Sequence, residues 1–217
     1  MPEPTAAGVR SALEAAASVD ERAKIRRRVT DGTEVIGVRM GTVFEIAKAN
    51  ERMPLPDVDE LLRSDTYELR MVAVSILDFQ ARRPGADREA LYTLWMRRID
   101  RIDTWDYIDR AAPRVLGWYL LDKPRDALFD LARSDDLWHR RMAVTAAFWI
   151  IRARDLDDPL ALCEILAADP EHVVQTNVGV ALREVGRVDP ERLAQFLERR
   201  GADLSAHARR TARTALG

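Results

Sequence analysis

The sequence predicts an all-α protein made of short helices joined by short turns. Apolar residues recur at helical spacing along most of the chain, and residues that favour helix N-termini precede several of these segments. Alternating runs of Val, Ile, Thr and Tyr bounded by tight Gly turns, which would indicate strands, are absent. Of the 217 residues, 47% are hydrophobic and 32% are charged, a balance typical of a folded globular protein. A chain of this length forms one large domain or two small ones, and we expect a single domain over 1–217.

In the first half of the chain, the expected helices lie between breaks rich in Gly, Pro and Asp. An Ala- and Arg-rich amphipathic segment comes first, and the break over 29–37 follows it. Capping residues mark three of the later helix starts: Asp57, Ser64 with Asp65, and Asp87. The helices expected here are 11–28, 39–50, 58–62, one that follows residue 65, and 87–101.

Two stretches in the middle of the chain, 103–121 and 134–151, combine helical spacing with unusual polar and aromatic residues. Pro113 lies inside the first stretch, where we expect it to kink the helix or to begin a new first turn. The remaining helices are expected at 125–133, 159–167, 173–185, 190–199 and 205–216. The sequence thus predicts about a dozen helices with short connections.

A weak internal repeat links these helices. Residues 64–74 read S-D-T-Y-E-L-R-M-V-A-V, and residues 134–144 read S-D-D-L-W-H-R-R-M-A-V. Polar residues recur near the start of the second helix of each pair at intervals of 31, 40, 31 and 36 residues: Arg39, Arg70, Arg110, Arg141 and Asn177. These intervals lie near the ~40-residue period of HEAT repeats, in which helix pairs stack into a solenoid. We therefore predict a C-shaped HEAT-like solenoid with a basic concave face that fits duplex DNA. Arginines that only brace neighbouring repeats would produce the same pattern.

The two middle stretches carry the candidate site. Trp105 and Asp109 are four residues apart, so on a helix they share one face, and an aromatic plane beside a carboxylate suits a cation. In the second stretch Arg140 and Arg141 follow Trp138, and a guanidinium suits a phosphate. Together these residues indicate a surface that holds a phosphodiester chain and stabilises positive charge on or near a sugar or base.

Other classes of chemistry have little support. The chain lacks the Walker loop, G-x-S-x-G, H-E-x-x-H and dinucleotide-binding patterns. Its three histidines lie far apart in sequence, so we expect neither a metal nor a cofactor. The single cysteine, Cys163, lies in an apolar helical run and is expected to be inert core in a reducing compartment. We find no signal-peptide pattern and no apolar run of about 18 to 20 residues, and we expect a cytosolic protein with no membrane contact.

The net charge is −2, so bulk charge does not indicate nucleic acid. Nearly all of the positive charge is arginine, which a genome bias would also explain. The three lysines, Lys24, Lys48 and Lys123, lie outside the two middle stretches, so we expect no amine nucleophile in either stretch.

Four segments carry a family resemblance: G-V-R-M-G-T-V-F-E-I-A-K (37–48), W-D-Y-I-D-R-A-A-P-R-V-L-G (105–117), S-D-D-L-W-H-R-R-M-A-V (134–144) and N-V-G-V-A-L-R-E-V-G (177–186). In their content and order they resemble the DNA alkylation repair (AlkD-like) family of HEAT-repeat DNA glycosylases. The resemblance implies excision of N3- and N7-alkylated purines from duplex DNA without base flipping. A glycosylase with lyase activity needs an amine nucleophile, and the lysines lie outside the two middle stretches, so a monofunctional hydrolase is the better prediction. It implies a catalytic carboxylate at Asp109, with Trp105 against the deoxyribose or lesion and Arg141 on a nearby phosphate. The arginines expected to contact DNA are Arg39, Arg70, Arg110, Arg140 and Arg141.

One position departs from the family pattern. Val180 stands where the family usually has a second cleft tryptophan, and a valine offers no aromatic face to a cation. Three further tryptophans, Trp118, Trp138 and Trp149, are expected in the core, and Arg183 is expected to pair with Glu184. Two alternatives therefore stay open beside the alkylpurine glycosylase: a weak or inactive module that binds DNA or protein, and a glycosylase specialised for bulky adducts. We expect a monomer.

Overall fold

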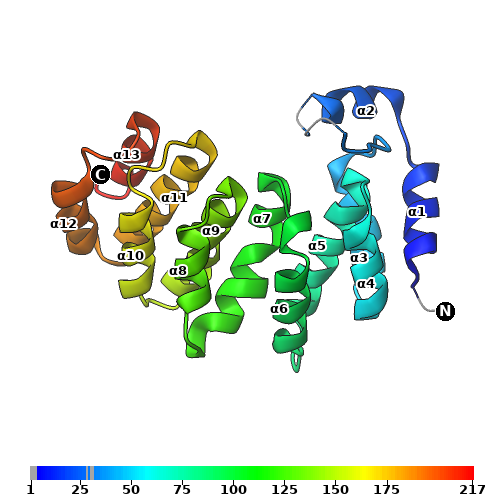
Figure 1. The fold of residues 1–217 in the computed structure, drawn as a ribbon, viewed down its shortest axis with the longest axis horizontal. Coiled ribbons are helices and arrows are strands. Elements are labelled where there is room, and N and C mark those ends of the chain that lie inside the picture. The colour runs from blue at the N-terminus through cyan, green and yellow to red at the C-terminus, as the bar shows by residue number, and fades with distance from the viewer. Residues whose placement is uncertain (1–3, 28, 30–31) are drawn as a thin grey trace. The chain divides into compact units, whose positions relative to one another are not determined.

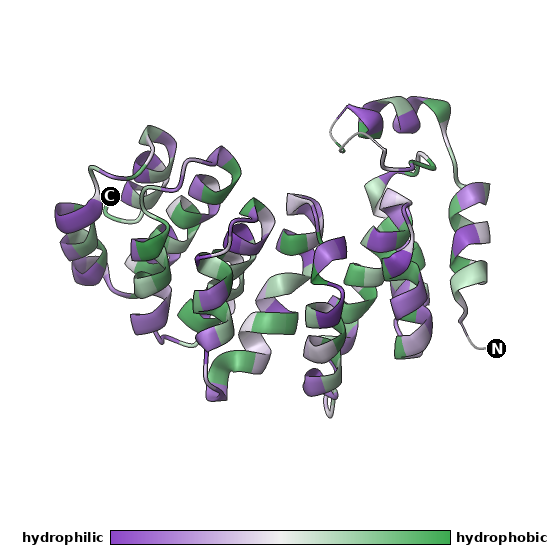
Figure 2. Ribbon diagram, viewed as in Figure 1, coloured by the Kyte–Doolittle hydropathy of each residue, from purple (hydrophilic) through white to green (hydrophobic). Residues whose placement is uncertain are grey.

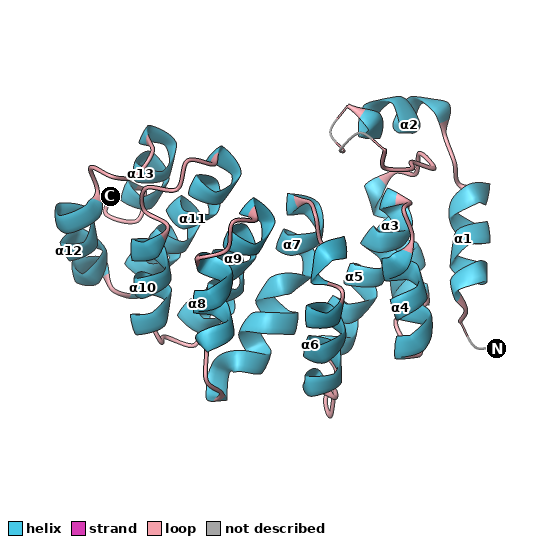
Figure 3. Ribbon diagram, viewed as in Figure 1, coloured by secondary structure: helices cyan, strands magenta, loops and turns pink. Residues whose placement is uncertain are grey.

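A computed structural model describes residues 4–27, 29 and 32–217. These residues form α-helices joined by loops, with no strand among them, which confirms the predicted all-α class (Figure 3). Glu34 and Thr66 form an isolated parallel bridge. The helices are α1 (Ala6–Ala15), α2 (Val19–Arg26), α3 (Met40–Ala49), α4 (Leu55–Arg63), α5 (Tyr67–Ala81), α6 (Arg88–Arg97), α7 (Trp105–Ala112), α8 (Asp126–Ala132), α9 (Leu137–Arg152), α10 (Asp157–Ile165), α11 (His172–Val188), α12 (Pro190–Arg200) and α13 (Ala206–Arg213).

The chain divides into two compact units, an N-terminal unit of residues 1–111 and a C-terminal unit of residues 112–217 (Figure 1). The expectation of a single domain over 1–217 stays a prediction. Each helix carries both hydrophobic and hydrophilic residues, as Figure 2 shows, so each can bury one side and expose another. Within the part of the chain that the structure describes, no helix combines the length and the apolar character that crossing a bilayer requires.

In the N-terminal unit, α5 forms the buried centre. The helices α3 and α4 both pack against α5, α1 contacts α3, α4 and α5, and α6 contacts α4 and α5. The fully buried carboxylate of Glu68 in α5 accepts hydrogen bonds from the backbone N–H groups of Ile36, Gly37 and Val38, at 3.0, 2.8 and 3.3 Å. These bonds fix the extended segment that leads into α3, so a single carboxylate connects the start of α5 to the start of α3.

In the C-terminal unit, the second helices of successive pairs pack side by side. The π-helical segment η2 (Pro113–Trp118) contacts α9, α9 contacts α11, and α11 contacts α13. The first helices lie beside them, with α8 against α9, α10 against both α9 and α11, and α12 against α11. The C-terminal unit is thus built from helix pairs, as the repeat predicts. The C-shaped solenoid and its basic concave face stay predictions.

The two copies of the S-D motif form the same local structure. Ser64 Oγ accepts a hydrogen bond from the backbone N–H of Thr66 at 3.1 Å before α5. Ser134 Oγ accepts one from the backbone N–H of Asp136 at 3.2 Å before α9. The repeat in sequence therefore corresponds to a repeated turn ahead of a long, largely buried helix.

Some expected helix boundaries differ from the structure. The helix expected over 11–28 is two helices, because the chain turns between α1 and α2 and Ser18 caps α2 through the N–H of Glu21. The expected cap Asp57 is wrong, since α4 starts at Leu55 and the Asp57 carboxylate lies in its first turn. Asp87 does cap α6, accepting from the N–H of Ala90 at 3.0 Å. Pro113 ends α7 and begins η2, as its missing N–H predicts.

Candidate functional site

The helix α7 presents Trp105 and Asp109 on its exposed face. Trp105 is the first residue of α7 and is 42% exposed, and Asp109, one turn later, is also exposed. The residues between and beyond them that point to the other side, Tyr107, Ile108 and Ala111, are fully buried. The predicted shared face is confirmed, and a large exposed aromatic side chain beside a carboxylate is available to a ligand.

A network of tyrosines and carboxylates holds the buried side of α7 against α5. Tyr107 donates its hydroxyl hydrogen to the backbone carbonyl of Tyr67 at 3.0 Å, and the two rings lie 5.5 Å apart. Tyr67 in turn donates its hydroxyl hydrogen to Asp106. Burial raises the pKa of Tyr107 well above its usual range, so its hydroxyl keeps its proton. These bonds fix the rotation of α7 about its axis, and with it the direction in which Trp105 and Asp109 point.

Arg70 in α5 holds the turn that precedes α7. Its guanidinium contacts both oxygens of Asp103 at 2.8 Å, donates to the Arg101 carbonyl at 3.1 Å, and lies 5.2 Å from the centre of the Tyr107 ring. Arg70 is only 3% exposed. In this structure Arg70 therefore acts as a brace between α5 and the turn before α7, and its predicted contact with DNA is not tested.

Arg110 has a similar set of protein partners. Its guanidinium lies 2.6 Å from the fully buried carboxylate of Asp78 and 3.0 Å from Ser75 Oγ, both in α5. It also lies 4.9 Å from the ring centre of Phe44 and 4.8 Å from that of Phe79. Arg110, the residue that follows Asp109, thus connects α7 to α5 and α3. Of the arginines expected on DNA, Arg39 is the exposed one, at the position before α3.

Arg140 and Arg141 lie in the C-terminal unit near the start of α9. The Arg140 guanidinium lies 2.6 Å from Asp169 and donates to the carbonyls of Ser134 and Asp135 at 3.0 and 2.8 Å. Arg141 is 4% exposed and donates to the Val173 carbonyl in the first turn of α11. Both side chains connect α9 to neighbouring segments, as expected if these arginines brace adjacent repeats. Their role on phosphate stays a prediction.

The tryptophans expected in the core are only partly buried. Trp118, Trp138 and Trp149 all keep some exposure. The rings of Trp118 and Trp149 stack on each other, with centres 4.8 Å apart and planes 20° apart. Val180 in α11 is also partly exposed, so a side chain at that position reaches the surface of the C-terminal unit.

Two further expectations are confirmed. Arg183 pairs with Glu184 at 2.9 Å, and Arg187 contacts the same carboxylate at 2.8 Å. Cys163 is fully buried, and burial raises the pKa of its thiol to about 12.

His172 and His207, far apart in sequence, place their ring centres 5.5 Å apart. Among the described residues, no group of three or more His, Cys, Asp or Glu side chains is arranged to hold a metal ion.

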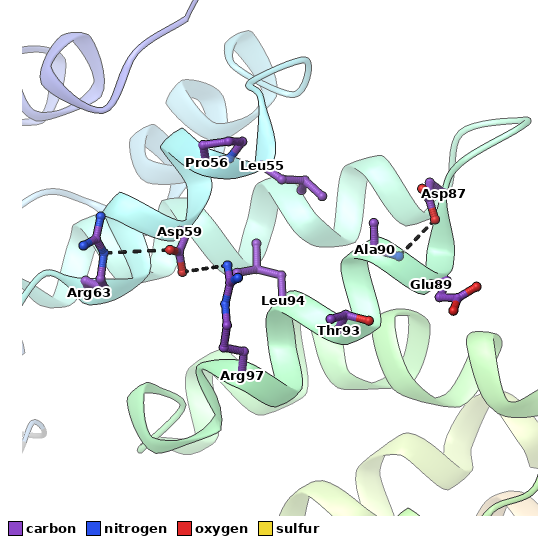
Figure 4. A pocket seen from close by; sticks show the side chains of 10 residues that line it. All are labelled: Leu55, Pro56, Asp59, Arg63, Asp87, Glu89, Ala90, Thr93, Leu94 and Arg97. Atoms are coloured by element: carbon purple, nitrogen blue, oxygen red, sulfur yellow. Dashed lines mark hydrogen bonds and ion pairs between the residues drawn. The ribbon is translucent and has the colours of Figure 1, made fainter.

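A separate pocket of about 660 Å³ lies between α4 and α6 (Figure 4). Asp59 lies in it beside Arg63 and Arg97, at 3.9 and 3.5 Å, and is also held by Arg98 at 2.5 Å. Neither Trp105 nor Asp109 lines this pocket. This pocket is therefore separate from the face that carries Trp105 and Asp109.

The carboxylate partners of Arg110 and Arg70, which are Asp78 and Asp103, are the residues that sequence reasoning missed. Asp78 stands alone among apolar residues in M-V-A-V-S-I-L-D-F-Q, and Asp103 lies just before α7. A single carboxylate within an apolar helical run signals a buried ion pair, because an unpaired buried charge is strongly unfavourable. That signal could have identified Asp78, although not its partner.

Comparison with known proteins agrees with this geometry. The family model described as DNA alkylation repair enzyme matches residues 9–216. The chain is also similar to a solved structure of a predicted DNA alkylation repair enzyme from Enterococcus faecalis, with a TM-score of 0.70 and 15% identity over 93% of this chain and 97% of that one. No curated protein matches the chain. At this identity the solved structure supports the fold alone, whereas the family match spans nearly the whole sequence and confirms the resemblance. The chain belongs to the family of DNA alkylation repair enzymes.

Proposed function

We propose that this protein is a DNA glycosylase that hydrolyses the N-glycosidic bond of N3- and N7-alkylated purines in duplex DNA. The observation that carries the proposal is the pairing of Trp105 and Asp109 on the exposed face of α7, while the opposite face is held by hydrogen bonds and ion pairs. Family membership supports a role in the repair of alkylation damage.

Hydrolysis of an alkylated purine needs few catalytic groups, because the base is already a good leaving group. An alkylated purine of this kind already carries positive charge, so the bond between C1′ and the base nitrogen breaks with its electron pair moving to the base. An oxocarbenium ion develops at the sugar. The Asp109 carboxylate stabilises that charge and orients a water that attacks C1′, and the proton released by the water passes to the carboxylate or to solvent. The products are the released base and an abasic site.

Trp105 supplies a flat apolar surface with a negative face, which suits a cationic base or the deoxyribose beside it. We propose that the reaction takes place with the base kept in the duplex rather than flipped out, as the family resemblance implies. We further propose that the exposed Arg39 contacts a phosphate of the duplex from the N-terminal unit. Three lysines outside 103–121 and 134–151 support a monofunctional hydrolase.

Val180 favours a second candidate function. The position is partly exposed, so a tryptophan there would offer an aromatic surface, and valine offers none. The protein would then be a weak or inactive relative that binds DNA or protein through the same helices, or a glycosylase whose site accepts bulky adducts. Replacing Val180 by Trp separates these possibilities, because a strong gain in excision of methylated purines identifies a weakened site.

The test measures release of 7-methylguanine from duplex DNA by the wild type, by Asp109→Asn and by Asp100→Asn. Asp100 is an exposed carboxylate in the same unit and serves as the matched control. We expect Asp109→Asn to lower the excision rate by about 100-fold or more while DNA affinity changes little, and Asp100→Asn to behave as the wild type. Equal excision by wild type and Asp109→Asn would remove Asp109 from the reaction.

A further inference from the structure

Four side chains in the C-terminal unit form a cluster of stacked planar groups, here named the Trp–Arg cluster: Arg114, Trp118, Trp149 and Arg152. The indoles of Trp118 and Trp149 are stacked at 4.8 Å. The guanidinium carbons of Arg114 and Arg152 lie 5.0 and 5.2 Å from the centre of the Trp149 ring. Two cations and two aromatic planes therefore meet at one place, where η2 passes the last turns of α9.

A glycine makes this stack possible. A Cβ at Gly117 would lie 2.1 Å from the carbonyl oxygen of Ala146 and 3.1 Å from the Cβ of Trp149. The backbone of η2 can therefore contact α9 only because residue 117 has no side chain, and the contact brings the neighbouring Trp118 onto Trp149. The stack is a built feature of the fold, with its indoles still partly exposed.

The charges of the cluster favour an anion. Elsewhere in this unit Arg125 and Arg140 each pair with an aspartate, at 2.7 and 2.6 Å. Arg152 is exposed, and within the described residues it has the Trp149 ring but no carboxylate as a partner. A phosphate bound at the edge of the Arg152 guanidinium supplies the negative charge that the described residues do not place beside this side chain. A guanidinium stacked on a ring also keeps the N–H groups at its edge directed outward for bidentate contact.

We propose that the Trp–Arg cluster binds a single-stranded segment of nucleic acid. Arg152 contacts a phosphate of the strand, and an unpaired base extends the column of indole and guanidinium planes. Stacked aromatic and guanidinium planes bind unpaired bases with little dependence on sequence, and the basic groups follow the backbone. A duplex buries its base faces in its own stack, so the planar groups of the cluster select for a single strand. The site lies outside Trp105 and Asp109 and does not depend on base excision.

The experiment measures binding of a fluorescein-labelled oligothymidylate of about 12 nucleotides, a length within the ~4–16 nucleotides that one single-strand site covers. Anisotropy gives the affinity, and quenching of tryptophan fluorescence reports base stacking. We expect Arg152→Ala to weaken binding about 5- to 10-fold and to reduce the slope of log K against log salt by about 0.7, the value for one phosphate contact on a single strand. Arg199→Ala removes an exposed arginine from α12 and should change neither quantity.

A second variant tests the planar stack separately from charge. Arg152→Lys keeps the charge but loses the flat guanidinium, so we expect it to keep the salt slope and to weaken binding and quenching. Equal affinity of wild type, Arg152→Ala and Arg199→Ala, or no binding by the wild type, would overturn the proposal. Preference for a duplex of the same length would also overturn it. If both proposals hold, Arg152→Ala should release 7-methylguanine at the wild-type rate. If no form of the protein releases the base, the proposed glycosylase activity fails, and the single-strand binding measurement still tests the Trp–Arg cluster.

Discussion

The ion pair between Asp78 and Arg110 provides a strong test of how α7 is held. The Asp78 side chain is fully buried, and the Arg110 side chain is 17% exposed and lies 2.6 Å from it. Arg82 also contacts Asp78, but its side chain is 42% exposed. We therefore consider Asp78→Leu, which removes the buried carboxylate and its ion pair with the mostly buried Arg110 guanidinium.

The magnitude follows from burial. Removing one partner of a buried ion pair costs about 3–5 kcal/mol. Arg110 keeps Ser75 Oγ at 3.0 Å and the rings of Phe44 and Phe79, so we expect the lower end, about 3 kcal/mol. For a protein of this size that corresponds to a fall in Tm of about 6–12 °C. Arg82→Ala, at the exposed edge of the same pair, should cost under about 1 kcal/mol.

The assay is urea unfolding followed by circular dichroism for the wild type, Asp78→Leu, Arg110→Met and the double variant. Replacing both charged partners by apolar side chains removes the unpaired charge, so the double variant should be more stable than Asp78→Leu. A cost below about 1 kcal/mol for Asp78→Leu, or additive losses in the double variant, would refute the reasoning. The salt dependence of DNA binding by Arg110→Met adds a second readout: a slope lower by about 0.9 would assign Arg110 to a phosphate as well.

Three further predictions follow from local geometry. Gly117→Ala should destabilise the C-terminal unit by about 3 kcal/mol in urea unfolding, because the new Cβ meets the Ala146 carbonyl oxygen at 2.1 Å; a stability equal to wild type would contradict the close approach. The Arg98 guanidinium holds the pKa of Asp59 below its ordinary 3.8, so this group stabilises the fold above pH 3.8 and the contribution is lost as pH falls through the lower folded value. The difference in unfolding free energy between wild type and Asp59→Asn should thus be present at neutral pH and shrink in acid, and a difference independent of pH would contradict the pairing. Burial raises the pKa of Cys163 to about 12, so iodoacetamide at pH 8 should label it in denaturant and leave the folded protein unmodified.

Much of the fold was predictable because helical periodicity and capping are local properties. The cap at Asp87, the end of α7 at Pro113 and the repeated turn at Ser64 and Ser134 follow from residues within a few positions of each other. The break between α1 and α2 was missed because Ala- and Arg-rich sequence has high helix propensity throughout. There the chain turns because Ser18 accepts the N–H of Glu21 and donates its own N–H to the Gly37 carbonyl at 2.8 Å, a partner distant in sequence.

The candidate site also has one part that local sequence predicts and one part that depends on tertiary contacts. The four-residue spacing of Trp105 and Asp109 predicts a shared helix face, and the fold places that face in solvent. The roles of the arginines were not predictable from spacing. The same positions of a repeat can hold an arginine that connects two helices or an exposed arginine that can bind a phosphate. Their burial and partners distinguish them: Arg70 is held by Asp103 and Arg141 by the Val173 carbonyl, whereas Arg39 is exposed.

The sequence by itself determined the all-α class and the face that carries Trp105 and Asp109, because periodicity and spacing act over one or two helical turns. The family followed from the likeness of four segments along the chain, which the family match over residues 9–216 confirms. Only the tertiary structure decided which charges are paired and which tryptophans meet. Asp78 lies 32 residues before Arg110, and Trp118 lies 31 residues before Trp149. Contacts over such separations depend on how helices pack, and the contact of Trp118 with Trp149 also depends on Gly117, which lets the backbones of η2 and α9 approach.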